Sequence, residues 1–122
     1  MAKVTLNNLT HPFRSPLSAE YRPDFLGKLL GLMFKTSLPA DQSLLMAEEK
    51  ESRVNTAIHM AFMNFDIGVI WLDCQYRVVD TRLARRWITL AMPKIAAKYT
   101  LEINPGRLSE FNYGDQIEII KK

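Results

Sequence analysis

The fold is decided by residues 65–80, which read FDIGVIWLDCQYRVVD. The β-branched and bulky side chains of 69–72 are typical of a buried strand, and 77–80 provide a second strand. Between them, 73–76 carries the polar side chains of a tight turn. This stretch therefore predicts two antiparallel strands joined as a hairpin.

Four further segments favour strands: 4–6, 43–47, 98–103 and 116–120. In 98–103 polar residues alternate with apolar ones, which is the period of two expected of a strand with one buried face. The alternation predicts that Lys98, Thr100 and Glu102 face water. One helical turn over 107–111 precedes the last segment, which we expect at an edge of the sheet or closing it.

A single helix is expected over residues 24–34. Asp24 can cap its start. Four apolar side chains then share one helical face: Leu26, Leu29, Leu30 and Met33. Three prolines in 11–23 indicate a surface connector, and the acidic run 48–51 indicates a solvated turn. Together the segments predict an α+β fold with predominantly antiparallel β pairing, a small barrel-like, strand-rich domain with one main helix.

Length and composition limit the class of protein. The chain has 122 residues, so we expect residues 1–122 to form a single domain. Sixteen basic and thirteen acidic side chains give a net charge of +3, which permits a polyanionic partner without requiring one. One cysteine, Cys74, excludes an internal disulfide. Because no secretion signal and no long apolar span is found, we expect a cytoplasmic protein with no membrane partner.

Several kinds of catalytic or metal site are disfavoured by the sequence. There is no glycine-rich phosphate loop, and a serine triad would have to use His11 or His59, neither of which lies in a nucleophile elbow. Cys74 sits in the hairpin turn beside Asp73, whose charge disfavours a reactive thiolate. His59 lies among methionines that could bind reduced copper, but methionines more often fill cores. We expect no metal and no cofactor.

Two aspartates flank the first strand of the hairpin. Asp66 precedes it and Asp73 follows it. With His59 they could form the acid–base or cation site of a hydrolase or a metal-assisted enzyme, if their side chains met. Aspartates at strand ends more often form turns, and the sequence leaves both interpretations open.

The strongest charge feature is the stretch 77–98, whose six basic side chains and one acidic one give a local charge of +5. Within it, Arg85, Arg86 and Trp87 place two forked hydrogen-bond donors beside an indole. These groups could grip a carboxylate or phosphate and stack on a planar group. The simpler interpretation, which the usual burial of tryptophan favours, is a solvated loop with Trp87 packed into the core.

The ordered blocks of the sequence resemble the domain-of-unknown-function 192 family, in the form found in archaea and some bacteria. The corresponding blocks are Asn8-Leu9-Thr10, Gly31-Leu32-Met33, Ile58-His59-Met60, FDIGVIWLD at 65–73, YRVV at 76–79, LARRW at 83–87, YTLEINPG at 99–106 and Gly114-Asp115. The resemblance covers nearly the whole chain. It implies a small β-rich, barrel-like fold with a short helix, and the family has no settled activity.

Three positions depart from the family's pattern at its centre. Asp66 stands where the family has proline, Gly68 where it has aspartate, and Tyr76 where it has the hairpin glycine. If the family's aspartate serves a ligand or a cation, Asp66 is the nearest carboxylate on the same face of the strand.

These observations support three hypotheses. The first is a non-enzymatic binding domain for a small anionic or planar ligand or a protein partner, with a ligand-binding rim formed by His59, Asp66, Arg85, Arg86 and Trp87. The second is a hydrolase or metal-assisted enzyme that uses His59 with Asp66 or Asp73. The third is weak nucleic-acid binding through 77–98, which is possible but not favoured.

Overall fold

The computed structural model describes residues 2–22, 38–53, 56, 58–59, 65–87 and 90–121. Its strands are β1 (Ala2–Asn8), β2 (Leu17–Arg22), β3 (Gln42–Ser52), β4 (Ile58–His59), β5 (Ile67–Leu72), β6 (Val78–Ala84), β7 (Leu90–Ala91), β8 (Ala97–Ile103) and β9 (Ile117–Lys121). A short 3-10 helix, η1 (Pro105–Glu110), precedes β9. The helix expected over 24–34 lies outside the described residues.

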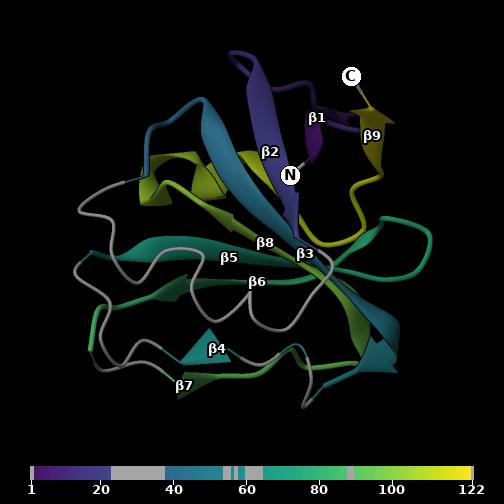
Figure 1. Ribbon diagram of the computed structural model, residues 1–122, viewed down its shortest axis with the longest axis vertical. Helices are drawn as coiled ribbons and strands as arrows, with labels where there is room; N and C mark the ends of the chain where they lie inside the picture. The colour runs from purple at the N-terminus through teal and green to yellow at the C-terminus, as the bar shows by residue number, and fades with distance from the viewer. Residues whose placement is uncertain are drawn as a thin grey trace.

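Seven strands form one mixed sheet in the order β6-β5-β8-β3-β2-β1-β9, and β4 pairs separately with β7 (Figure 1). Each neighbouring pair of strands is antiparallel except β2 and β3, which run parallel. Parallel neighbours need a crossover connection, which here is the segment 23–41. The prediction of a strand-rich fold with predominantly antiparallel pairing is confirmed.

The sheet is not a closed barrel. Its outer strands, β6 and β9, have one neighbour each in the sheet order, and an isolated bridge between Arg77 and Gln116 joins the segments that lead into them. Barrel closure needs a continuous hydrogen-bonded ladder between the outermost strands. Of the expected barrel closure, the described residues therefore show only the bridge between Arg77 and Gln116.

The predicted hairpin is formed by β5 and β6, with Trp71 opposite Asp80. Tyr76, in its turn, has a φ of 63°, which is the left-handed region that favours glycine. Its ring lies 4.6 Å from the ring of Tyr99, centroid to centroid, and the two hydroxyl groups are hydrogen-bonded. The ring and the hydroxyl group of Tyr76 thus both have a partner in Tyr99.

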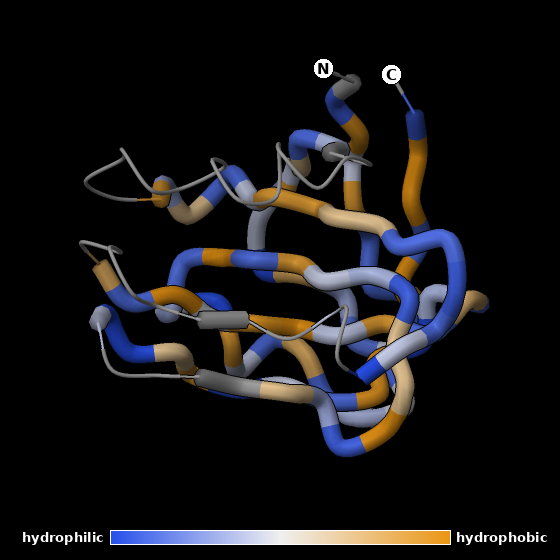
Figure 2. The backbone as a smooth tube through the Cα atoms, turned by 60° about the horizontal axis from the view of Figure 1, so that its bottom comes forward, coloured by the Kyte–Doolittle hydropathy of each residue, from blue (hydrophilic) through white to orange (hydrophobic). Residues whose placement is uncertain are grey.

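Both faces of β5 are buried, and its alternate side chains enter two different apolar clusters. Ile67, Val69 and Trp71 belong to one cluster, whereas Ile70 and Leu72 belong to the other. Along the tube in Figure 2, hydrophobic segments follow the strands and many of the connecting bends are hydrophilic. The core therefore lies on both sides of the central strands.

Three local expectations were wrong. The connector expected over 11–23 contains β2, and the turn expected at 48–51 lies within β3. In β8, Thr100 and Glu102 are buried, with 1% and 6% of their surface exposed, although their alternation predicted a solvated face. Glu102 lies opposite Leu44 and Val69 on the neighbouring strands, so its face of the strand looks into a core.

Candidate functional site

The loop after β6 carries the basic and aromatic residues singled out in the sequence. Arg85, Arg86 and Trp87 are all exposed, and 57% of Trp87 is accessible to solvent. Trp87 has a φ of 65°, in the left-handed region. The expectation that Trp87 packs into the core is therefore wrong, because more than half of its surface is accessible to solvent.

Asp66 fastens this loop to the start of β5. Its Oδ1 accepts a hydrogen bond from the backbone N–H of Arg86 at 2.9 Å, and Nε of the same arginine lies 3.3 Å away. The backbone hydrogen bond is the main cause that holds the pKa of Asp66 below its ordinary value, and the charges of Arg86 and Arg85 add to it. The structure thus brings Asp66 and Arg86 together and keeps the carboxylate ionised.

The other predicted acidic residue, Asp73, is separated from Asp66. The two aspartates lie just beyond opposite ends of β5, and seven residue steps along a strand span about 23 Å. Asp73 Oδ1 accepts hydrogen bonds from the backbone N–H groups of Gln75 and Arg77, as a turn-forming aspartate does. The suggestion that the two carboxylates share one acid–base or cation site is therefore wrong.

The remaining predicted residue, His59, lies in β4, where its backbone is paired opposite Leu90 of β7. Its side chain lies outside the described residues, so a role for it in the ligand-binding rim stays a prediction. Within the described part of the chain, no group of three or more histidine, cysteine or acidic side chains could hold a metal ion. Cys74 is exposed, and partial desolvation of the thiol, with its hydrogen bond to Glu51, raises its pKa.

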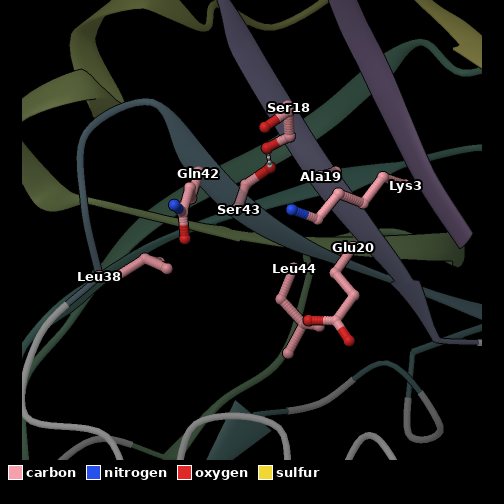
Figure 3. A pocket seen from close by; sticks show the side chains of 8 residues that line it. All are labelled: Lys3, Ser18, Ala19, Glu20, Leu38, Gln42, Ser43 and Leu44. Atoms are coloured by element: carbon pink, nitrogen blue, oxygen red, sulfur yellow. Dashed lines mark hydrogen bonds between the residues drawn. The ribbon is translucent and has the colours of Figure 1, made fainter. Parts of the chain in front are cut away.

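A shallow pocket of about 100 Å³ lies over β1, β2 and β3, away from the predicted site residues (Figure 3). Its lining consists of Lys3, Ser18, Ala19, Glu20, Leu38, Gln42, Ser43 and Leu44. The hydroxyl group of Ser43 donates to the carbonyl of Ser18, and that of Ser18 to the carbonyl of Asp41. Pockets for drug-sized ligands are about 300 Å³ or larger, so this one suits at most a small polar molecule.

Sequence reasoning missed a second cluster, which joins β1 to the segment before β9. Nδ1 of His11 lies 2.8 Å from Oδ1 of Asp115. The other oxygen, Oδ2, accepts hydrogen bonds from the side chain of Asn8 at 2.8 Å and from the backbone N–H of Asn112 at 2.9 Å. Asp115 is buried, whereas the His11 side chain is 60% exposed. The residues are about a hundred positions apart, so no local spacing could reveal the pair.

Hydrogen bonds keep Asp115 ionised in spite of its burial. Burial raises the pKa of this carboxyl, but the hydrogen bonds from Asn8, Asn112 and His11 together bring it below its ordinary value. The side chain of Asn8 also accepts from the backbone N–H groups of Thr10 and His11. The cluster therefore fixes the loop that carries the histidine.

Gly68, which departs from the resembled pattern, has no room for a side chain. A Cβ atom at Gly68 would lie 2.9 Å from Cγ1 of Ile103 and 3.3 Å from Cδ1 of Leu108. Both distances are shorter than ordinary van der Waals contact, because β8 and η1 pack directly on the glycine. This chain therefore has no carboxylate at position 68 of β5 that could bind a ligand.

No helix among the described residues is long and apolar enough to cross a membrane. Two solved structures are similar to this chain in fold. One is a candidate transcription regulator from Sinorhizobium meliloti, with a TM-score of 0.82 and 17% identity over 97% of this chain and 92% of that one. The other is a protein of unknown function from Novosphingobium aromaticivorans, with a TM-score of 0.76 and 20% identity over 95% and 83%. At these identities the likeness concerns the fold alone.

Curated relatives carry the name UPF0127. The protein of Thermococcus gammatolerans is 41% identical over 68% of this chain and 52% of its own length. That of Thermococcus kodakarensis is 42% identical over 76% and 59%, and that of Pyrococcus horikoshii is 38% identical over 77% and 80%. The chain thus spans a little over half the length of the two Thermococcus proteins. The family model described as Uncharacterized ACR matches residues 9–119, and the chain therefore belongs to the DUF192 family of uncharacterized proteins.

Proposed function

We propose that this chain is a binding domain that accepts a small anionic or planar ligand at the corner formed by Asp66 and residues 85–87. The conformation of Trp87 carries the proposal. A non-glycine residue in the left-handed region costs about 1–2 kcal/mol, and an exposed indole forgoes the stabilisation of burial. Together these features present an aromatic face to a ligand.

The chemistry of the corner indicates which ligand would fit. Arg85 and Arg86 offer planar, forked donors suited to a carboxylate or a phosphate, and the indole of Trp87 offers a stacking surface. Asp66 holds the backbone of the loop in place. A molecule that joins a planar ring to an anionic group would use both kinds of contact at once.

Nucleic acid is a second candidate, favoured by the exposed cations along β6 and the loops beside it. Arg77, Arg82, Arg85, Arg86 and Lys94 are all exposed. The name of the Sinorhizobium protein refers to transcription regulation, which is a reason to test this class of ligand here. Binding of this kind would weaken steeply as salt is added, because counterions are released from the phosphates.

The two described tryptophans allow a direct test. Trp71 is fully buried, so the response of the emission to an added ligand comes mainly from the exposed Trp87. We would titrate the protein with nucleoside monophosphates, aromatic carboxylates and short oligonucleotides, and measure affinities by calorimetry. A ligand at this corner should change the emission of Trp87 with saturation.

Charge variants then assign the binding. Arg85→Gln with Arg86→Gln should weaken binding about tenfold or more, which corresponds to the loss of about 1.4 kcal/mol. The matched control, Lys3→Gln with Lys121→Gln, removes the same charge from exposed sites on β1 and β9. The proposal fails if no class of ligand alters the emission, or if both double variants bind alike.

A further inference from the structure

The pair of His11 and Asp115 sets an exposed imidazole against a buried carboxylate. An ionised carboxylate can only accept hydrogen bonds, so the 2.8 Å contact assigns the proton of the neutral imidazole to Nδ1. The lone pair of the neutral ring is then on Nε2. Because 60% of the His11 side chain is exposed, reagents in solution can reach the ring.

The carboxylate is held by more than the histidine. Asn8 and the backbone of Asn112 bind its second oxygen, and Asp115 itself is almost completely buried. The imidazole therefore meets a fixed negative charge on one side and solvent on the other. An imidazole oriented by a carboxylate in this way is the arrangement that nucleophilic and general-base histidines use.

We propose that His11 and Asp115 form a reactive pair, in which Nε2 of His11 takes an acyl group from an activated ester and passes it to water. The lone pair of Nε2 attacks the carbonyl carbon, a C–N bond forms, and the C–O bond breaks with its electrons going to the leaving alcohol. Water then attacks the acyl carbon, the C–N bond breaks, and the carboxylic acid is released. The proton that water loses returns to the alkoxide through solvent, so the sum is ester hydrolysis.

Asp115 acts through the histidine as a positioning residue. The acylated ring keeps its Nδ1 proton and carries a positive charge, which the carboxylate 2.8 Å away stabilises. Leu9 lies two residues before His11, and Tyr113 lies two residues before Asp115. Their side chains are 58% and 77% exposed. They offer apolar surface for an acyl chain.

This site is separate from the one proposed for ligand binding. The backbone N–H of Val78, at the start of β6, donates to the carbonyl of Asp115, whereas residues 85–87 follow the far end of the same strand. The length of β6 separates the two sites by about 20 Å. Failure of one proposal therefore leaves the other untouched.

The test follows the release of para-nitrophenolate from para-nitrophenyl acetate, with N-acetylhistidine amide at equal concentration as the reference. We expect the wild-type protein to react about tenfold faster than the reference, with acylimidazole visible by its ultraviolet absorbance. His11→Gln should lose this excess, because glutamine has no nucleophilic nitrogen. The variant should still fold, since the side chain of His11 lies on the surface. Lys121→Gln, the matched control at an exposed site on β9, should retain it.

Asp115→Asn tests the positioning role in protein shown to be folded by its melting curve. It should return both the rate and the acylimidazole signal to the level of the N-acetylhistidine amide reference, which a merely structural carboxylate would not control. A wild-type rate equal to the reference overturns the proposal, as does full activity of His11→Gln. These two outcomes decide the matter even if Asp115→Asn does not fold.

Discussion

Glu110 should make the stability of the protein depend on acid pH. Its Oε2 lies 2.8 Å from Nε of Arg107, and its Oε1 accepts from the backbone N–H of Arg14 at 2.9 Å. The hydrogen bond from Arg107 is the main cause that lowers the pKa of Glu110 from 4.5 to about 2. At 1.36 kcal/mol per pKa unit, the difference corresponds to about 3 kcal/mol of stability.

The sign follows from the direction of the shift. Because the pKa is lower in the folded protein, the stabilisation is complete above the ordinary value of 4.5 and is lost as the pH falls toward 2. Glu110→Gln removes the ionisable group but leaves the charge of Arg107 buried. The variant should therefore be about 3 kcal/mol less stable than wild type near neutral pH, and the difference should fall below about 1.5 kcal/mol by about pH 3.

Urea unfolding, followed by the emission of buried Trp71, measures the free energy of unfolding of wild type and variant near neutral pH and at about pH 3. The control is Glu118→Gln, which removes a carboxylate from the exposed surface of β9, where it accepts a hydrogen bond from Asn7. That variant should differ from wild type by less than about 1 kcal/mol at every pH. A gap between wild type and Glu110→Gln that stays constant from neutral to acid pH would refute the reasoning.

Three further predictions concern the turn, the glycine and the loop. At Tyr76 the left-handed backbone conformation costs free energy in Tyr76→Ala but not in Tyr76→Gly. Urea unfolding should therefore find the glycine variant about 1 kcal/mol more stable than the alanine variant; equal stabilities would contradict this. Gly68→Asp forces a charged side chain against Ile103 and should lower stability by more than about 3 kcal/mol, with a melting point close to wild type as the contrary result. Asp66→Ala removes the acceptor for Arg86 at the surface, so the melting point should stay close to that of wild type, and yet the variant should bind any ligand detected through Trp87 more weakly; unchanged affinity would contradict the role of Asp66 in holding the loop.

Local sequence patterns predicted much of the fold. The hairpin of β5 and β6 followed from a bulky run, a polar turn and a second run, and the positions of β1, β8, η1 and β9 followed from residue types and alternation. β2 was missed because prolines just before and after it suggested an irregular connector. The length of β3 was missed because its acidic second half has the composition of a solvated turn.

The candidate sites were harder to predict from the sequence. Asp66 and Arg86 were both singled out, but their contact across the start of β5 could not be inferred, because it depends on how the loop after β6 folds back. His11 was considered only as a triad member and set aside. Its partner, Asp115, was quoted as part of a family motif without a role, since the two are joined only by the pairing of β1 with β9.

Local signals in the sequence were enough to predict the hairpin, most of the strands, the final helical turn and the resemblance to the family. Four features became known only from the folded chain: which strands are neighbours, that β2 and β3 run parallel, that Glu102 is buried and that Trp87 is exposed. The physical reason is that alternation marks two faces of a strand without saying what covers each face. Burial, and with it the meeting of His11 and Asp115, depends on contacts between residues far apart in the chain.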